Sequence, residues 1–111
     1  KFQPLKQEEV ANLFKVADLI RQNTAIPCTG CSYCTDGCPK HIAIPKYFAL
    51  YNGDKREAAT KGWTINGTYY NQLCEKFGKA SDCIECGQCE AMCPQHLTIR
   101  KFLKDVANHF E

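Results

Sequence analysis

The sequence has no long apolar segment. No apolar run approaches the length that crosses a lipid bilayer, which argues against a membrane span. The chain opens Lys-Phe-Gln-Pro without the apolar run of a secretory signal peptide, and the missing initiator methionine suggests a fragment of a longer chain. We therefore do not expect a secreted or membrane-inserted protein.

The sequence also lacks an excess of one charge. Lysine and arginine number 14 against 12 aspartates and glutamates, which gives a formal net charge of +2 with neutral histidines. So small a surplus gives no support to nucleic-acid binding. The length of 111 residues, with 44% apolar and 23% charged residues, indicates one globular domain with a modest core.

Segments that alternate polar and apolar residues are nearly absent, so we predict an all-α fold. Residues 6–22 have the pattern of an amphipathic helix. Its apolar face consists of Val10, Leu13, Phe14, Ala17 and Ile20. We expect this face to pack against the rest of the domain, with a neighbouring domain as the alternative.

Four further helices have start or stop signals. Their expected ranges are 45–51, 54–61, 69–77 and 98–110. The expected stops of the first three are Asn52-Gly53, Gly62 and Gly78. Asp54 is the expected cap of the 54–61 helix, Asn66-Gly67 predicts a turn, and Asp82 with Glu85 predicts a capping box. Thr98 is the expected cap of the last helix, whose apolar face consists of Ile99, Phe102, Leu103, Val106 and Phe110.

Cysteine is abundant, and eight of the nine cysteines fall in two copies of one pattern. Residues 28–39 read CTGCSYCTDGCP and residues 83–94 read CIECGQCEAMCP, so both follow Cys-x2-Cys-x2-Cys-x3-Cys-Pro. This is the bacterial ferredoxin signature for 4Fe-4S cubes, in which the fourth cysteine reaches the other cube. We therefore expect two 4Fe-4S clusters as cofactors. Their ligands would be Cys28, Cys31, Cys34 and Cys93 for one cube, and Cys83, Cys86, Cys89 and Cys38 for the other.

Three other roles for these cysteines fit the sequence less well. A disulfide scaffold is opposed by the odd count and by the residue-for-residue repeat of the spacing. Zinc ribbons need cysteine pairs, whereas each motif supplies a third evenly spaced thiol and a Cys-Pro step. A thioredoxin-like dithiol lacks its usual alternation of strands and helices. Because iron is held here by thiolates, the reducing cytoplasm is the expected location.

A shift of 55 residues superimposes more than the cysteines. CPKHIAIPKYF at 38–48 matches CPQHLTIRKFL at 93–103, which predicts a duplicated unit with approximate two-fold symmetry. For His41 and His96, which recur after each Cys-Pro, we expect a structural hydrogen bond, with iron ligation or proton-coupled transfer as alternatives. Gly30 and Gly87 either bring N–H donors close to sulfur or serve turn geometry.

A few remaining residues have a functional interpretation beside a plainer one. Cys74, the ninth cysteine, is expected to be a small buried residue rather than a spare ligand or reactive thiol. Tyr33, Tyr47 and Trp63 are candidates for electron routes, but packing is the expected role. Lys55, Arg56 and Lys61 form a basic face, expected as solvated surface, with docking of an acidic partner or parent enzyme as the alternative.

Three segments together resemble the C-terminal dicluster ferredoxin domain of iron–sulfur-containing aldo/keto reductases. They are PCTGCSYC at 27–34, CPKHIAIPKYFALYN at 38–52 and ASDCIECGQCEAMCPQHLTI at 80–99. The resemblance covers nearly the whole chain and implies a helical ferredoxin-like fold serving a nicotinamide-binding barrel. Similar modules occur in succinate dehydrogenase iron–sulfur subunits and in flavin-linked reductases. No catalytic residue of the barrel is carried onto this chain.

The sequence thus predicts one helical dicluster domain over residues 1–111. Its parts are a leading helix and linker (1–26), the first motif and its helix (27–52), a helical connection (53–80), and the second motif with the terminal helix (81–111). The predicted function is one-electron transfer between an electron carrier and a redox enzyme, an aldo/keto reductase first, with no catalytic site of its own. The alternatives are a freestanding ferredoxin-like subunit of a flavin- or membrane-linked oxidoreductase and, less favoured, a structural zinc module.

Overall fold

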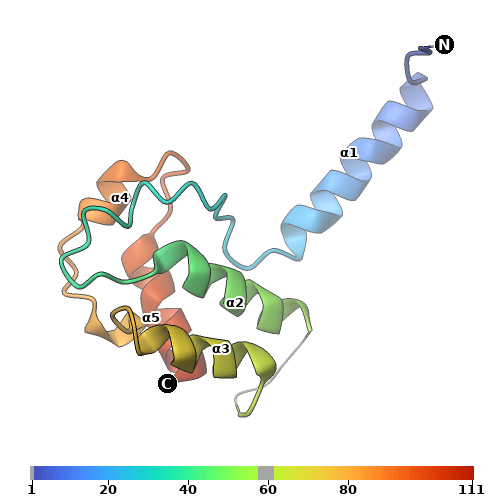
Figure 1. The fold of residues 1–111 in the computed structure, drawn as a ribbon. Helices are drawn as coiled ribbons and strands as arrows, with labels where there is room; N and C mark the ends of the chain where they lie inside the picture. Colours follow the sequence, from blue (N-terminus) through green and yellow to red (C-terminus); the bar gives the residue numbers. More distant parts are fainter. Residues whose placement is uncertain (1, 58–61) are drawn as a thin grey trace.

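The computed structural model describes residues 2–57 and 62–111, and in this range it contains helices and no strand (Figure 1). The elements are α1 (Gln7–Gln22), α2 (Ile44–Arg56), α3 (Ile65–Cys74), the 3-10 turn η1 (Ala80–Asp82), α4 (Gln88–Met92) and α5 (Ile99–Phe110). The predicted all-α fold is confirmed. None of the helices in the described residues is long and apolar enough to cross a membrane.

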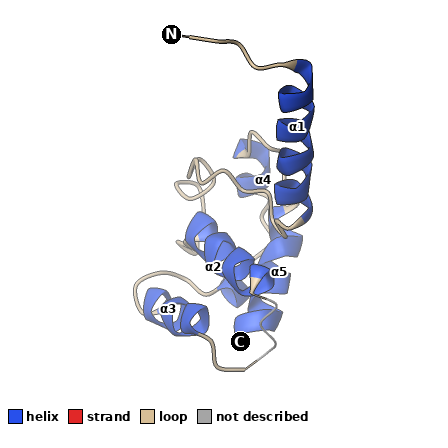
Figure 2. Cartoon of the chain, turned by 90° about the vertical axis from the view of Figure 1, so that its right-hand side faces the viewer, coloured by secondary structure: helices blue, strands red, loops and turns tan. Residues whose placement is uncertain are grey.

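Helices α2, α3 and α5 pack together around the core, while α4 and the two cysteine loops lie at one end of this group (Figures 1 and 2). The core is aromatic between the helices. The ring centroids of Tyr47 and Tyr70 are 4.7 Å apart, and Tyr70 stacks on Phe110 at 4.9 Å. The core is completed by three residues of α5, Ile99, Leu103 and Val106, which are all buried, as the helical spacing predicts.

Helix α2 is continuous through Asn52-Gly53, where the sequence predicts a break, so that prediction is wrong. The side-chain amide of Asn52 accepts a hydrogen bond from the Ile26 N–H and donates one to the Ile26 carbonyl, both at 2.8 Å. Asn52 therefore tethers the segment before the first cysteine to the side of a helix. The predicted helix over 54–61 falls partly on residues 58–61, which lie outside the described residues.

Helix α3 begins earlier than predicted, because Thr64 caps it. The Thr64 hydroxyl oxygen accepts a hydrogen bond from the Gly67 N–H at 3.0 Å, which places Asn66-Gly67 in the first helical turn. The helix ends at Cys74, ahead of the predicted end at residue 77. The local turn signal of Asn-Gly is overridden by a capping residue just before it.

The predicted capping box of Asp82 and Glu85 is also wrong. The Asp82 carboxylate accepts instead from the Lys79 N–H at 2.9 Å, within η1. Glu85 has a positive φ of 58° and pairs with Lys104, and the helix of this motif starts later. Thr98 does precede α5 as predicted, although its side chain makes no capping hydrogen bond.

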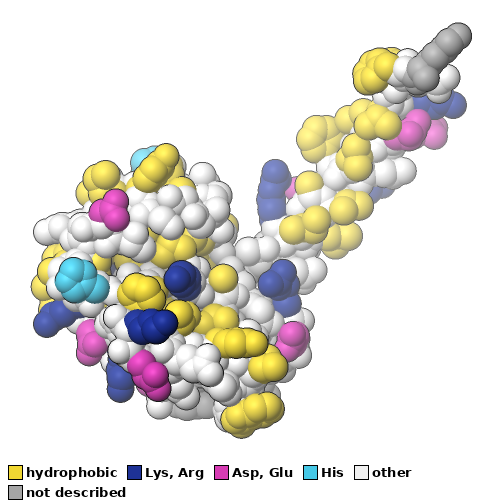
Figure 3. Space-filling model, in the orientation of Figure 1, with side chains coloured by type: hydrophobic (Ala, Val, Ile, Leu, Met, Phe, Trp, Pro, Cys, Tyr) yellow, Lys and Arg dark blue, Asp and Glu magenta, His cyan; other side chains and the backbone are white. Residues whose placement is uncertain are grey.

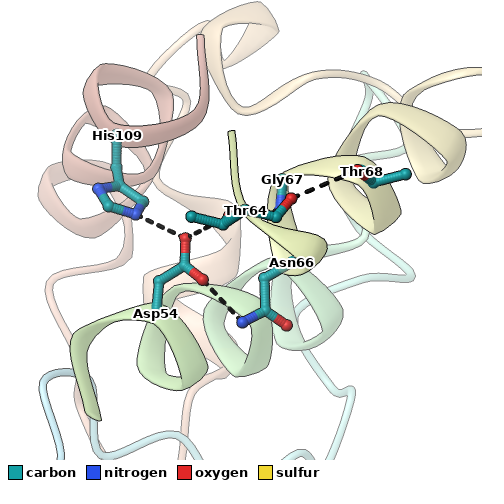
Figure 4. Close-up of polar contacts among 6 residues, drawn as sticks. All are labelled: Asp54, Thr64, Asn66, Gly67, Thr68 and His109. Atoms are coloured by element: carbon teal, nitrogen blue, oxygen red, sulfur yellow. Dashed lines mark hydrogen bonds and ion pairs between the residues drawn. The ribbon is translucent and has the colours of Figure 1, made fainter. Parts of the chain in front are cut away.

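A buried carboxylate joins the three packed helices (Figure 4). Asp54 of α2 is 1% exposed and accepts hydrogen bonds from Thr64 at 2.9 Å and Asn66 at 2.7 Å, and its other contact is His109 Nε2 of α5 at 2.8 Å. Burial alone raises the pKa of Asp54, but the hydrogen bonds from Asn66, His109 and Thr64 outweigh burial and hold it below its usual value of 3.8. Asp54 lies inside α2 and not at the start of a helix, so its predicted role as a cap is wrong.

Replacing Asp54 with asparagine is expected to lower the free energy of unfolding at pH 7 by about 1–3 kcal/mol, because buried donors lose a charged acceptor. Since the folded-state pKa of Asp54 is lowered, its stabilisation is present above pH 3.8 and is lost as pH falls through the folded pKa. Urea unfolding of wild type and Asp54→Asn should therefore converge as pH falls below 3.8. Asp18→Asn, on the exposed surface of α1, is the control. Equal stability of the Asp54 variant and wild type at pH 7 would contradict this prediction.

Helix α1 projects away from the other helices, and none of its residues is buried (Figures 1 and 2). It lengthens the molecule, whose principal extents are 51 × 33 × 25 Å. Its apolar side chains are exposed along the helix (Figure 3), including Leu13 at 56%, Phe14 at 66% and Ile20 at 63%. The expected packing of this face against the rest of the domain is therefore wrong.

Candidate iron–sulfur centres

The eight motif cysteines surround two separate cavities. Cys28, Cys31 and Cys34 line the first cavity together with Cys93 of the second motif. The second cavity is lined by Cys83, Cys86, Cys89 and Cys38. Each cavity thus takes three thiols from one motif and the fourth from the other.

Buried apolar side chains form the inner walls of both cavities. Phe48 and Ile99 line the first and Leu103 the second, and all three are at most 1% exposed. Ile44 lines both, so the cavities are neighbours on either side of the start of α2. Pro45 stands in the first turn of that helix as predicted, where a missing N–H costs nothing. The site is therefore positioned by the N-terminal turns of α2 and α5.

The backbone of the two cysteine loops repeats with the same shift of 55 residues. Positive φ occurs in pairs, with Gly30 at 74° and Glu85 at 58°, Ser32 at 68° and Gly87 at 79°, and the two histidines at 53° and 54°. Non-glycine residues rarely adopt such angles, and strain of this kind clusters at functional sites. The predicted two-fold duplication therefore extends to the backbone conformation.

Backbone N–H groups lie close to the first sulfur of each motif. The Gly30 N–H donates to Cys28 Sγ and the Glu85 N–H to Cys83 Sγ, both at 3.4 Å. Gly30 therefore combines both roles predicted for it. Gly87 serves turn geometry, as the left-handed residue before α4.

The two histidines act through their main chain. The N–H of His41 donates to the Cys38 carbonyl and that of His96 to the Cys93 carbonyl, both at 3.1 Å. Both side chains are exposed. These bonds fix the turn that follows each Cys-Pro, but they come from the backbone and do not involve the imidazoles, so the structural role predicted for the two histidines stays a prediction.

The cysteines differ in exposure. Cys34 and Cys89 are buried, and burial raises the pKa of the Cys34 thiol to about 11 and also raises that of Cys89. Cys31 and Cys86 are exposed, so each cavity has one edge near solvent. Because cluster ligands are thiolates, iron binding has to displace the protons of the buried thiols.

The donor sets fit a polynuclear cluster. Across residues 2–57 and 62–111, no three His, Cys, Asp or Glu side chains lie close enough together to hold a single metal ion. The thiols are instead spread around two apolar-walled spaces, four to each. A 4Fe-4S cube needs this arrangement, with one thiolate for each iron.

Comparison with known families agrees with this geometry. Residues 27–98 match the family model described as the 4Fe-4S dicluster domain. The chain belongs to the 4Fe-4S dicluster domain family. Two 4Fe-4S clusters are therefore the cofactors of this dicluster domain, and its activity is electron transfer. No curated protein and no solved structure matches the chain.

The remaining residues singled out in the sequence of this dicluster domain have mixed outcomes. Cys74 lies outside both cavities, half-buried against the core, with its Sγ 3.7 Å from the Tyr47 hydroxyl. Tyr47 is fully buried, as its predicted packing role requires. Tyr33 and Trp63 are 60% and 84% exposed, so packing was the wrong prediction for them.

The predicted basic face is partly described. Lys55 and Arg56 are exposed, as expected for solvated surface, and the Lys55 Nζ lies 5.2 Å from the centroid of the Tyr51 ring. Lys61 lies outside the described residues. The expected surface role therefore holds for the two residues that can be placed.

Gly78 packs closely against residues 40–42, which contribute to the wall of the second cavity, and the sequence did not predict this contact. Its N–H donates to the His41 carbonyl at 3.1 Å, and its carbonyl accepts from the Tyr47 hydroxyl at 2.7 Å. A Cβ at this position would lie 2.2 Å from the Lys40 carbonyl oxygen. The sequence predicts Gly78 as a helix stop, whereas the structure uses it because only glycine fits.

Replacing Gly78 with alanine is expected to destabilise the domain by about 1–3 kcal/mol, because the clash is with backbone and the 40–42 segment has to move. Thermal unfolding measured anaerobically checks the stability, and iron loss on dilution checks the second cavity. Gly37→Ala is the control, since its φ is not positive and a Cβ there would meet only the Gln88 side chain, with Oε1 at 3.3 Å. An alanine variant at 78 as stable as wild type would show that the approach is not tight.

Proposed function

We propose that this domain relays single electrons between an electron carrier and a redox enzyme, through one cluster in each cavity. In this proposal the first cavity's cluster is ligated by Cys28, Cys31, Cys34 and Cys93, and the second cavity's by Cys38, Cys83, Cys86 and Cys89. The observation that carries the proposal is the placement of four thiols around each of two neighbouring cavities. Residues 1–111 are taken as one domain.

Four thiols per cavity favour a relay over substrate chemistry. A metal centre that acts on a substrate keeps an open coordination position, and a cube with four thiolates has none. When bound, each 4Fe-4S cluster supplies reversible one-electron chemistry. The chain's own part is to bind the irons and to exclude water with Ile44, Phe48 and Leu103. The N–H groups of Gly30 and Glu85 hydrogen-bond sulfur, which favours the more negative, reduced state.

The exposed edges of the two cavities supply routes to partners. Cys31 of the first cavity and Cys86 of the second are both exposed, so an electron can enter at one edge and leave at the other. Ile44 is shared by the two walls, which keeps the centres adjacent. This arrangement suits a path that runs through the molecule.

We infer that the redox enzyme is an aldo/keto reductase on the same polypeptide, as the sequence resemblance implies. The exposed apolar face of α1 is the surface we assign to contact with that enzyme. A nicotinamide cofactor transfers two electrons as hydride, and two one-electron centres couple such a step to a one-electron carrier. Reading the coding region upstream tests this inference, since an in-frame barrel supports it and a nearby start codon supports a freestanding subunit.

The relay is tested on anaerobically reconstituted protein. Iron and sulfide analysis should give about eight of each per chain, and reduction should give EPR signals from two centres. A folded sample that binds zinc, stays colourless and accepts no electron would end the proposal. Retention of only one reducible cluster would also contradict it.

A further inference from the structure

The walls of the two cavities are copies of one another. Apart from Ile44, every residue that lines the first cavity has its partner 55 positions away on the wall of the second. Phe48 corresponds to Leu103, and Leu97 to Ile42. Any difference between the two centres must therefore come from the few positions at which the residue type changes.

Two of those changes introduce a charged residue, and in both cases the charged residue lines the second cavity. Gln95 of the first cavity corresponds to Lys40 of the second, and Pro45 corresponds to Arg100. No charged residue lines the first cavity among the described residues. The second cavity therefore has two cations on its wall where the first has none.

Neighbouring carboxylates reduce this difference without removing it. Arg100 Nη2 lies 3.0 Å from Glu90 Oε2, and the backbone N–H of Arg100 donates to the other Glu90 oxygen at 3.0 Å. Lys104 pairs with Glu85. Lys40 makes no ion pair within residues 2–57 and 62–111. Of these charged residues, Lys40 and Arg100 line the cavity and the carboxylates of Glu85 and Glu90 do not.

Positive charge beside a redox centre favours its more negative state. A cluster with four thiolates becomes more negative by one charge on reduction, so nearby cations raise its reduction potential. Lys40 and Arg100 are both exposed, and solvent screening reduces the effect of each. Their effects still act in the same direction and on the same cavity.

We propose that Lys40 and Arg100 make the second cluster the preferred site of the first electron taken up by the domain. An electron that enters at the first cluster then passes to the second, so that the first is oxidised by one electron as the second is reduced by one, with no proton or bond transferred. This inference rests on the proposed relay and gives it a direction. In the singly reduced domain the electron then resides mainly on the cluster of the second cavity.

The test is an anaerobic potentiometric titration, followed by EPR, of the full chain with both clusters. Wild type should show two separate one-electron steps. Lys40→Gln and Arg100→Gln should lower the higher-potential step and leave the lower one unchanged. In the double variant the equilibrium preference for the second cluster should fall about tenfold, which is about 59 mV for a one-electron couple.

A reciprocal variant and two controls sharpen this test. Gln95→Lys places a cation on the first cavity and should raise the lower-potential step alone. Arg100→Lys keeps the charge and should leave both steps near their wild-type potentials. Lys101 lies on α5 beside Arg100 but lines neither cavity, so Lys101→Gln should shift neither step.

The outcomes separate this inference from the relay itself. If samples with about eight irons show no shift, or if Lys40→Gln and Arg100→Gln move the lower step, the inference is wrong while the relay stands. If Arg100→Gln loses iron because its contact with Glu90 is lost, Gln95→Lys decides, and failure to raise the lower step overturns the inference. A chain without two reducible clusters refutes the relay.

Discussion

Replacing Cys93 with alanine is expected to remove the cluster of the first motif, although Cys93 belongs to the second. Cys93 lines the first cavity with Cys28, Cys31 and Cys34, so its loss leaves that cube with three thiolates. The iron content should fall from about eight to about four per chain. Iron and sulfide analysis of anaerobically purified protein measures this loss.

Pairs of variants identify which cluster is lost. With crossed ligands, Cys93→Ala and Cys34→Ala should leave the same residual EPR spectrum, while Cys38→Ala and Cys89→Ala should share a different one. The double variant of Cys34 and Cys93 should lose no more iron than either single variant. If Cys93→Ala instead matches Cys89→Ala, each motif would hold its own cube. Cys74→Ala, outside both cavities, should keep all its iron.

Removing the iron is expected to abolish cooperative unfolding of the domain. Ile44, Phe48, Ile99 and Leu103 are at most 1% exposed and line the cavities, so they would pack beside the clusters and lose those contacts when the iron is removed. The lost metal bonds and packing contacts together should cost several kcal/mol, which is comparable to the whole stability of a small domain. Chelation under argon, followed by circular dichroism during heating, should replace a sharp transition with a gradual one.

Reconstitution with iron and sulfide should restore the sharp transition, which separates this effect from irreversible damage. Part of the helical signal should survive in the iron-free chain, because Tyr47, Tyr70 and Phe110 pack without contacting either cavity. An iron-free chain that unfolds as cooperatively as the loaded one would show that folding and metal binding are independent.

The sequence predicted the features that depend on short-range spacing. The helical periodicity of three and four residues predicted helices where α1, α2, α3 and α5 lie. The cysteine spacing, repeated after 55 residues, predicted the two motifs and the duplication. Two 4Fe-4S clusters and electron transfer followed from the same spacing. These are local properties of the chain, so no knowledge of tertiary contacts was needed.

The errors occurred where a distant partner decided the outcome. Asn52-Gly53 reads as a turn, yet Asn52 bonds to Ile26 and the helix continues. Asp54 was predicted to cap a helix, yet its carboxylate contacts His109, which lies 55 residues further along the chain. The apolar face of α1 reads as part of the core, yet it is exposed. Helix boundaries and packing partners of this kind are set by tertiary structure, which outweighs local propensity.

Because each cavity is lined by cysteines of both motifs, neither has all four thiols until the second motif has been synthesised. A ribosome releases Cys28, Cys31 and Cys34 early, whereas Cys93, which completes the first cavity, emerges near the end of the chain. The second cavity waits in the same way for residues 83–89. With the proposed ligands, we therefore expect the insertion of iron and sulfide to follow translation. A nascent chain that stalls before residue 83 should hold neither cluster.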